Sequence, residues 1–276
     1  MDPAIVDRLR CPVCDRALAA VPGALRCEVG HAFDVARQGY VNLVAGRAAL
    51  PGDDARMVAA RADVLAAGHY APLAAAIADL AAEAPGDGLA VEVGAGTAYH
   101  LACVLERQPE RRGLALDASR YAARRAARAH PRLGAVVADA TRRWPVADGS
   151  AAILLDVFAP RNGAEFRRVL RPDGILVVVT PAPDHLVELR AVLGLLDVDP
   201  EKARRLSAAL DPHFRRGVAA RQAWPLRLGR EDVGRAVAMG PSARHADPAD
   251  LAGRLAALPD RITVTAAFQV EVCRPR

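Results

Sequence analysis

Three cysteines and one histidine near the start of the chain have the spacing of metal ligands. Cys11 and Cys14 form a Cys-x2-Cys pair, and after twelve residues Cys27 and His31 form a Cys-x3-His pair. Each short pair lets two ligand atoms face one point, which a tetrahedral Zn2+ requires. Because all four protein ligands are accounted for, we expect a closed structural site in which zinc contributes folding energy and performs no chemistry.

A second stretch, "LAVEVGAGTAYH" at 89–100, has the features of a nucleotide-binding loop. An apolar run carrying Glu92 leads into Gly94 and Gly96. Glycines let the backbone pass close to a ligand, and the helix that follows would direct its N-terminal dipole at that ligand. The third glycine of a dinucleotide fingerprint is Ala98 here, so the stretch alone also fits a plain strand-to-helix turn.

Two further acidic residues strengthen the nucleoside interpretation. Asp117 in "LALDAS" lies about twenty residues beyond the glycines, where a carboxylate can accept hydrogen bonds from ribose hydroxyls. Asp139 in "VVADA" would lie where an adenine amino group can reach it. With Glu92 they place three acids at three successive strand ends, which favours a crevice for a nucleoside.

The elements that must position these residues follow from hydrophobic periodicity. From about Leu89, short apolar runs alternate with helix-like stretches, which predicts a parallel sheet covered on both faces. The segment 57–84 predicts amphipathic helices broken near Gly68. The final run, "RITVTAAFQVEV", alternates as a half-buried antiparallel strand does.

Composition places limits on the class of protein. The chain has 276 residues, 52% of them hydrophobic, which is enough for one large domain and a small module. We expect a zinc-binding module at 1–46, a helical linker at 47–85 and the main domain at 86–276. The net charge of +5 permits an RNA partner without establishing one.

Cysteine usage and hydropathy predict the cellular context. Cys103 and Cys273 have no ligand-like partners and are expected to be ordinary core residues. The sequence shows neither a disulfide framework nor a signal peptide, which favours a cytoplasmic location. No window approaches the roughly 18 to 20 continuous apolar residues of a membrane span, so we expect no membrane partner.

The loop, the two later acids and the stretch "LRPDGILVVVTP" at 170–181 together resemble the class I methyltransferases that use S-adenosylmethionine. In that class a Leu-Arg/Lys-Pro-Gly-Gly turn precedes the fifth strand, and Asp173 replaces its first glycine here. The resemblance implies a Rossmann-like α/β fold with a mixed seven-stranded sheet. A nicotinamide enzyme stays open from the loop alone, but it would not be expected to carry the late turn.

Nearly the whole chain is similar to the large-subunit rRNA guanine-N1 methyltransferases of the RlmA type. Besides the metal and cofactor motifs, the resemblance rests on these stretches: "GYVNL" at 39–43, "GDD" at 52–54, "AGHYAPL" at 67–73, "VFAPRN" at 157–162 and "TPAPDHLVEL" at 180–189. "FAPRN" and "MGPSARH" at 239–245 resemble the Gram-positive branch. The branch implies guanine 748, otherwise 745, in helix 35 of 23S rRNA as the substrate, tylosin-like macrolide resistance in some members, and a homodimer.

The family also implies roles for particular residues. Tyr70 and His185 match positions that touch S-adenosylmethionine, as do the loop residues Thr97, Ala98, Tyr99 and His100. From the sequence alone, Tyr70 is interpreted as a core aromatic. His185 follows a proline-rich strand end, which favours a position near the site because ligands bind beyond the carboxyl ends of such strands; the alternative is a cap of the helix that follows it.

Guanine N1 carries a proton, so a base or a polarised carbonyl should help to expose its lone pair. Two residues are candidates for a position near that proton: Asp156 at the end of the fourth strand, and His185.

RNA binding would need basic residues along the path of the phosphates. The candidates lie in the module and the linker: Arg8, Arg10, Arg26, Arg37, Arg47, Arg56 and Arg61. Each also reads as an ordinary surface arginine. Two other functions stay open, a methyltransferase for a small molecule and a zinc-dependent RNA-binding protein with a vestigial donor site.

Overall fold

A computed structural model describes residues 1–46, 50–195, 201–240 and 247–276. Five parallel strands form its centre, in the spatial order β7-β6-β5-β8-β9. Their bounds are β5 Leu89–Val93, β6 Gly113–Asp117, β7 Leu133–Val137, β8 Ala151–Val157 and β9 Leu170–Pro181. Each coincides with one of the apolar runs in the sequence, so the predicted parallel sheet is confirmed.

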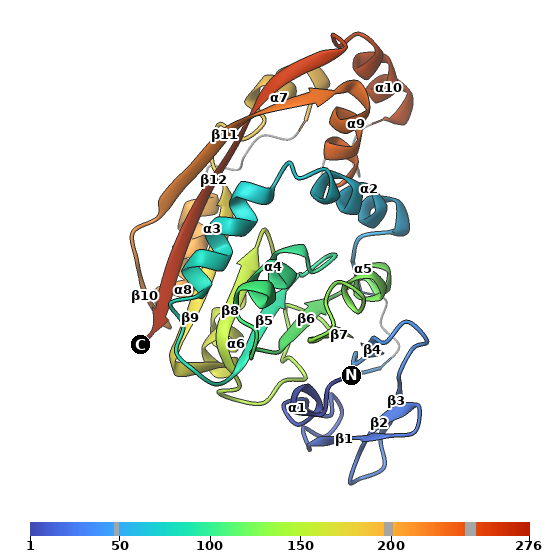
Figure 1. Cartoon of the computed structure of the whole chain (residues 1–276), viewed down its shortest axis with the longest axis vertical. Coiled ribbons are helices and arrows are strands. Elements are labelled where there is room, and N and C mark those ends of the chain that lie inside the picture. Colours follow the sequence, from blue (N-terminus) through green and yellow to red (C-terminus); the bar gives the residue numbers. More distant parts are fainter. Residues whose placement is uncertain (47–49, 196–200, 241–246) are drawn as a thin grey trace.

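Beyond β9 the sheet becomes antiparallel. The closing strand β12, Arg261–Pro275, pairs with β9 through Phe268–Cys273. Its first half pairs only with β11, Ala220–Gly229, so these two strands continue past the sheet as a two-stranded ribbon (Figure 1). The predicted antiparallel end strand is therefore confirmed.

The mixed sheet expected for class I is present, with nine strands among the described residues where seven were expected. One addition is β4, Val41–Asn42, which pairs with β7. The other arises because the outer strand is divided into β10, Phe214–Arg216, and β11. The division falls at Gly217, where a Cβ would lie 2.6 Å from the carbonyl oxygen of Val272 and no larger residue would fit.

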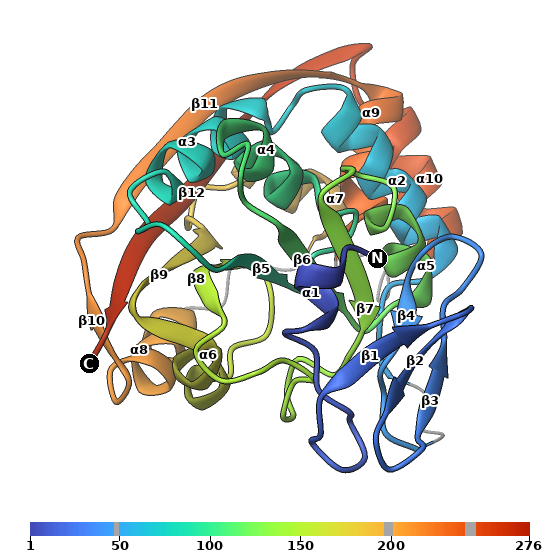
Figure 2. The same ribbon diagram turned by 60° about the horizontal axis from the view of Figure 1, so that its bottom comes forward.

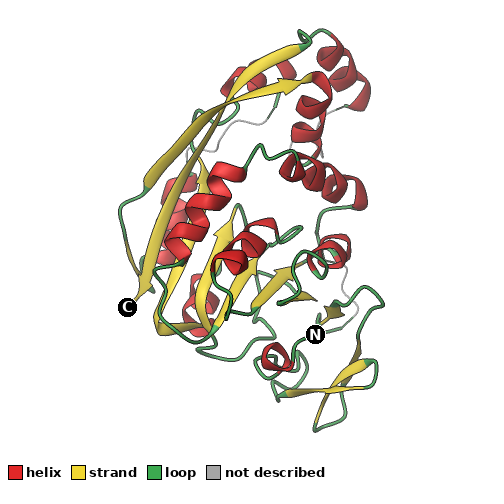
Figure 3. Ribbon diagram, in the orientation of Figure 1, coloured by secondary structure: helices red, strands yellow, loops and turns green. Residues whose placement is uncertain are grey.

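Helices cover both faces of the sheet, as Figure 3 shows. Alternate residues of each central strand face opposite ways: Ala90 and Ile153 lie in one core cluster, and Val91 and Leu154 in the other. The helices are α2 Ala55–Ala66, α3 Ala71–Ala81, α4 Tyr99–Arg107, α5 Arg120–Ala126, α6 Gly163–Val169, α7 Val187–Leu193, α8 Lys202–Leu210, α9 Arg230–Ala238 and α10 Pro248–Ala256.

The helices α2 and α3 are separated at the predicted break. Gly68 has a φ of +78°, a left-handed conformation that favours glycine. No described helix alone is long and apolar enough to cross a membrane; α2 and α3 meet that criterion only when taken together across their 83° bend.

The N-terminal segment packs against the edge of the sheet formed by β7 and β4 (Figure 2). It contains α1, Pro3–Val6, and the antiparallel strands β1 Leu18–Val21, β2 Ala24–Cys27 and β3 Ala32–Asp34. Ile5, Val6 and Leu9 are fully or almost fully buried in the core cluster beneath the sheet. The segment therefore shares a core with the sheet, and the proposed boundary at residue 46 remains a prediction.

Candidate functional site

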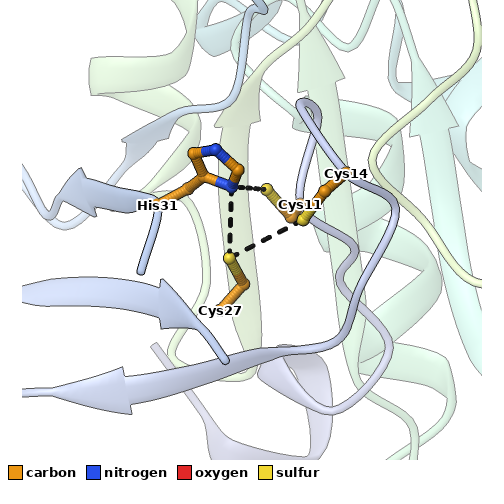
Figure 4. A group of neighbouring side chains, drawn as sticks. All are labelled: Cys11, Cys14, Cys27 and His31. Carbon is orange, nitrogen blue, oxygen red and sulfur yellow. Dashed lines mark hydrogen bonds between the residues drawn. The ribbon is translucent and has the colours of Figure 1, made fainter. Parts of the chain in front are cut away.

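The four predicted metal ligands converge on one point (Figure 4). The Nδ1 atom of His31 lies 3.6 Å from Cys11 Sγ and 3.4 Å from Cys27 Sγ, and the Sγ atoms of Cys14 and Cys27 lie 3.7 Å apart. A tetrahedron with metal–sulfur bonds of about 2.3 Å has edges of about 3.8 Å, so the cluster has the size of a tetrahedral zinc site.

Tight backbone turns hold the ligands in place. The amide of Cys11 donates to the carbonyl of Arg16, and the Cys11 carbonyl accepts from the amide of Asp15, which has a left-handed φ of +60°. Cys27 and His31 are joined in the same way by a 3.0 Å bond from the Cys27 amide to the His31 carbonyl. Local sequence thus sets this site.

The surroundings of two of these thiols shift their pKa values in opposite directions. Burial opposes ionisation of Cys27, but the hydrogen bonds from His31 lower the pKa of its thiol to about 6. The Arg16 amide lowers the pKa of Cys14, but burial and the neighbouring thiols of Cys11 and Cys27 raise it overall. Three sulfur atoms and one imidazole nitrogen that lie within 4.8 Å of one another form a donor set that fits a structural Zn2+.

A cavity of about 340 Å3 lies at the carboxyl ends of β5, β8 and β9. Ligands of doubly wound α/β proteins bind at this edge of the sheet. Of the predicted cofactor residues, these line it: Tyr70, Glu92, Gly94, Tyr99, His100 and His185. The residues Gly96, Thr97, Ala98, Asp117 and Asp139 lie outside the lining.

Glu92 and His100 form a buried pair in the cavity wall. Glu92 accepts from the Leu101 amide at 3.2 Å, and its other oxygen lies 3.5 Å from His100 Nδ1. His100 Nε2 is buried, and within the described chain no group forms a hydrogen bond with it. A buried polar atom without a partner is costly, so this atom is a candidate contact for a bound ligand.

The loop backbone explains the glycines. Gly94 and Gly96 have φ values of +58° and +56°, and a Cβ on Gly94 would lie 2.7 Å from the Cβ of Ala159. Ala98 adopts the same left-handed conformation, with a φ of +58°, at the N-cap of α4. Position 98 thus has a left-handed backbone that favours glycine but carries a methyl group, which costs conformational energy.

Asp117 lies directly behind this loop. Its carboxylate accepts from the amides of Gly96, at 2.8 Å, and Ser119, at 2.7 Å. Burial raises the pKa of Asp117 although these two hydrogen bonds oppose the shift. The "GDD" segment covers the same strand end, since Ser119 Oγ donates to the carbonyl of Asp53 at 2.5 Å.

Asp139 is placed further out, at the end of β7. Its carboxylate accepts from both the hydroxyl and the amide of Thr141, at 2.7 and 2.9 Å, and approaches Arg142. The Thr141 hydroxyl holds the pKa of Asp139 below its usual value. The three predicted acids thus lie at successive strand ends, but only Glu92 faces the cavity.

Tyr70 and His185 meet at the cavity wall although they are 115 positions apart. Phe268 of β12 lies between them, with ring centroids 5.5 Å from Tyr70 and 4.6 Å from His185. Burial raises the pKa of the Tyr70 hydroxyl, which keeps it neutral. The Ala267 amide donates to His185 Nδ1 at 3.2 Å, so a neutral His185 ring carries its proton on Nε2.

Asp156 occupies a different environment from the one expected for a base. Its side chain is fully buried, accepts from the Ala159 amide at 3.1 Å and lies 3.2 Å from the Arg161 guanidinium. It does not line the cavity. Asp156 therefore holds the "FAPRN" loop, and the geometry does not favour the hypothesis that it accepts the guanine proton.

Sequence reasoning missed several residues of the cavity. Arg61, assigned to phosphate contacts, lines the cavity instead; it pairs with Asp53 at 2.7 Å and donates to the Met239 carbonyl. Phe158 has a φ of +59° and is 43% exposed at the cavity. The motif "VFAPRN" was a signal for Phe158, whereas nothing local distinguishes Arg61 or Phe268.

The other predicted phosphate contacts are dispersed. Arg10 donates to the carbonyls of Asp7 and Leu9. Arg8, Arg26 and Arg56 are exposed. Arg47 and most of the "MGPSARH" stretch lie outside the described residues.

Comparison with known proteins agrees with this geometry. The family profile "RlmA, N-terminal", a zinc ribbon, matches residues 9–46. A Micromonospora griseorubida protein, provisionally named 23S rRNA (guanine-N1)-methyltransferase, is 54% identical over 100% of both chains. The Streptomyces fradiae protein named 23S rRNA (guanine(748)-N1)-methyltransferase is 51% identical over 98% of each chain.

Solved structures support the fold. A protein from Anaeromyxobacter dehalogenans, provisionally named a type II methyltransferase, superposes with a TM-score of 0.51 and 20% identity, covering 73% of this chain and 95% of that one. At this level of identity the likeness concerns the fold alone. It confirms the methyltransferase-like α/β architecture expected from the sequence.

Proposed function

Because this chain belongs to the family of 23S rRNA (guanine-N1)-methyltransferases, we propose that it transfers a methyl group from S-adenosylmethionine to N1 of a guanine in 23S rRNA. The observation that carries the proposal is the cavity at the carboxyl ends of the strands, in a chain that also holds a closed zinc site. A small-molecule enzyme would not need the zinc module as a second contact, so this alternative has less support.

The cavity fits the methyl donor chemically. S-adenosylmethionine, when bound, supplies an electrophilic methyl group on a sulfonium. Aromatic rings of Tyr70, Tyr99 and Phe268 suit a cationic centre, because ring faces attract positive charge. Glu92 would attract the ammonium group and Arg61 the carboxylate, while His100 Nε2 offers a buried polar contact. Asp117 and Asp139 lie outside the cavity lining, at the ends of β6 and β7. A donor that extends from the cavity along these strand ends would bring its ribose hydroxyls to Asp117 and its adenine amino group to Asp139.

Phe158 is the proposed contact for the guanine. Its ring is partly exposed at the cavity and packs against Phe268, with centroids 5.4 Å apart. A target base has to leave its stack to reach an enclosed site, and unstacked bases are held on aromatic side chains. The Asp156–Arg161 pair would keep the loop that carries Phe158 in place.

Loss of the N1 proton would be assisted by polarisation. His185 Nε2 carries the proton of a neutral ring and so acts as a donor, to an oxygen of the cofactor or to guanine O6. A hydrogen bond to O6 stabilises the charge that develops there as the N1 proton leaves. The role proposed for His185 is therefore that of a donor, and the N1 proton passes to solvent water as the methyl group moves from the sulfonium to N1.

Finer features follow the family. We propose guanine 748 in helix 35 as the target, since a relative identical at 51% of positions carries that number in its name. We further propose that residues 1–46 recognise RNA, that residues 86–276 catalyse methyl transfer, and that residues 47–85 link these two domains. The chain is also proposed to form a homodimer. Modification at this guanine would confer tylosin-like macrolide resistance on its host.

The test is methylation of a defined RNA. Purified protein is incubated with labelled S-adenosylmethionine and an unmodified transcript of helices 33 to 35, and the product is mapped by mass spectrometry. A single N1-methylguanine at 748 is expected. Sedimentation analysis of the same sample tests the homodimer. Transfer to a different position would correct the target, and no transfer despite measured donor binding would overturn the proposal.

A further inference from the structure

The helix α5 exposes a cluster of basic residues that played no part in the sequence analysis. Arg120, Arg124, Arg125 and Arg128 are all exposed on α5 or directly after it, and we call them the α5 arginines. Tyr121 is also exposed, at 37%, and the Arg120 guanidinium lies 5.0 Å from the centroid of its ring. The cluster thus combines positive charge with an aromatic ring.

Three of these arginines have no acidic partner among the described residues, whereas several other arginines of the molecule have one. Arg168, Arg216 and Arg235 each form ion pairs with carboxylates. Within the part of the chain that the structure describes, Arg124, Arg125 and Arg128 form none. Three neighbouring cations without counter-charges repel one another, and binding of a polyanion would relieve that repulsion.

The α5 arginines border a hollow between α5 and α2. Arg124, Arg125 and Arg128 line it together with Val58, Ala62 and Thr97. Among the described residues that line this hollow, none is an aspartate or a glutamate. The surface therefore offers cations and small or apolar side chains, a composition suited to the phosphates of a nucleic acid.

The position of this surface joins the two parts of the proposed enzyme. In Figures 1 and 2, α5 lies between α2 and β4. The turn that contains Arg37 abuts α5, since a Cβ on Gly39 would lie 3.8 Å from the Cβ of Ala127. On the other side, Thr97 belongs to the loop whose residues Gly94 and Tyr99 line the donor cavity.

From this placement we infer that the α5 arginines bind the phosphates of the RNA substrate and hold it between the zinc module and the donor cavity. The inference rests on the proposed function for the identity of the RNA. Phosphate contacts fix orientation without reading sequence, so the surface would align the hairpin while its guanine enters the cavity.

The test compares two double variants of equal charge. Arg124→Gln/Arg128→Gln removes two α5 arginines, and Arg204→Gln/Arg215→Gln removes two exposed arginines on α8 and β10, at the opposite edge of the sheet. Affinity for the helix 33 to 35 transcript is measured over a range of salt concentrations. Each lost phosphate contact lowers the slope of log K against log salt by about 0.7 to 0.9, so the α5 variant should lose about 1.5.

For the α5 variant, we expect weaker RNA binding and a reduced slope of log K against log salt. The control variant should keep the wild-type slope, and both variants should bind S-adenosylmethionine with unchanged affinity. Equal slopes in the two variants, at the wild-type value or below it, would overturn the inference.

A methylation assay of the same proteins separates the inference from the proposed function. If wild-type protein methylates the transcript while the α5 variant keeps the wild-type slope, only the inference fails. If the slopes differ as expected but no methyl group is transferred, only the proposed function fails.

Discussion

His185 shows how a single backbone contact sets the chemistry of a side chain. Because the Ala267 amide donates to Nδ1, the neutral ring carries its proton on Nε2. His185 therefore presents an N–H, and not a lone pair, to a ligand that contacts Nε2. Glutamine can supply a similar donor, whereas phenylalanine supplies the ring shape without it.

We predict that His185→Gln keeps the single-turnover rate within about tenfold of wild type, and that His185→Phe loses more. A general base contributes about 10²- to 10⁴-fold, so a loss of that size in His185→Gln, with donor affinity unchanged, would reassign His185 as the base. Asp156→Asn serves as the comparison, since its effect should appear as lower stability of the loop beside the cavity.

Ala98 carries backbone strain at the start of α4. An L-residue in the left-handed region loses about 1 to 2 kcal/mol relative to the right-handed one, and glycine does not. Ala98→Gly and Ala95→Gly both remove a buried methyl group from the same loop, but only position 98 has a positive φ. We predict that Ala98→Gly is the less destabilising by about 1 to 2 kcal/mol in urea unfolding. Equal effects would show that the strain at position 98 is absent in solution.

We predict that Asp117 makes the affinity for S-adenosylmethionine depend on pH. Burial raises the pKa of Asp117, so its carboxylate takes up a proton at a higher pH than an ordinary aspartate does. Ribose hydroxyls donate to the ionised form, so affinity for S-adenosylmethionine should fall as the pH is lowered toward the usual pKa range of an aspartate, and the fall should begin above that range.

Calorimetric titration of wild type, Asp117→Asn and Asp139→Asn measures this effect. Asp117→Asn should bind weakly with little dependence on pH, and Asp139→Asn should retain the wild-type dependence, because the pKa of Asp139 is lowered and that group stays ionised. A wild-type dependence that survives in Asp117→Asn would assign the titration to another group.

At the scale of elements, the bend between α2 and α3 and the β11–β12 ribbon build one wall of the cavity together. Trp224 of β11 donates its Nε1–H to the carbonyl of His69 at 3.1 Å, and the next residue, Tyr70, is the N-cap of α3. Phe268 of β12 then packs against Tyr70. The ribbon thus holds the linker helices over the donor site.

The strands β1 to β3 depend on the metal. They bury few side chains, chiefly Leu18, Leu25 and Cys27, so little apolar area stabilises them. Structural zinc sites contribute about 10 to 16 kcal/mol in small modules. We predict that removal of zinc by a chelator unfolds residues 11–34 and weakens RNA binding, and that Cys14→Ser has the same effect. The strands β5 to β9 should remain folded, and the affinity for S-adenosylmethionine should change by less than about twofold.

Hydrogen exchange with bound zinc quantified in parallel tests this dependence. Cys103→Ser, outside the cluster, is the control and should keep both the metal and the protection of β1 to β3. Persistent protection of these strands after complete loss of zinc would show that packing on β7 alone holds the module.

At the scale of the whole molecule, the donor cavity is assembled from segments distant in sequence. Arg61 and Tyr70 come from the linker helices, Glu92 from β5, Phe158 from the end of β8, and Phe268 from β12. A ligand that contacts all of them stabilises the folded chain by mass action.

We predict that S-adenosylmethionine at 100 times its Kd raises the free energy of unfolding by about 2.7 kcal/mol. Hydrogen exchange should slow at 61–70, 92–100 and 264–268 together, with β1 to β3 unaffected. Protection confined to the 92–100 loop would show that the linker and the ribbon do not contact the donor.

Local patterns in the sequence determined the zinc ligands, the strand runs and the turn glycines. Cys11 and Cys14 lie on one turn, and Gly94 follows directly on β5, so nearest-neighbour geometry fixes these features. The alternation of β12 likewise needed only the strand period of two. Resemblance to the family supplied the cofactor roles of Tyr70 and His185. The sequence alone placed only His185 near the site, because it follows a proline-rich strand end.

Tertiary structure alone decided which side chains meet. It buried Asp156 against Arg161, moved Arg61 from an expected RNA surface into the cavity wall, and left three of the α5 arginines without acidic partners among the described residues. It also extended the sheet by β4 and divided its outer strand at Gly217. These outcomes depend on how helices and strands far apart in sequence pack together, and the type of a residue does not reveal which neighbour that packing will bring to it.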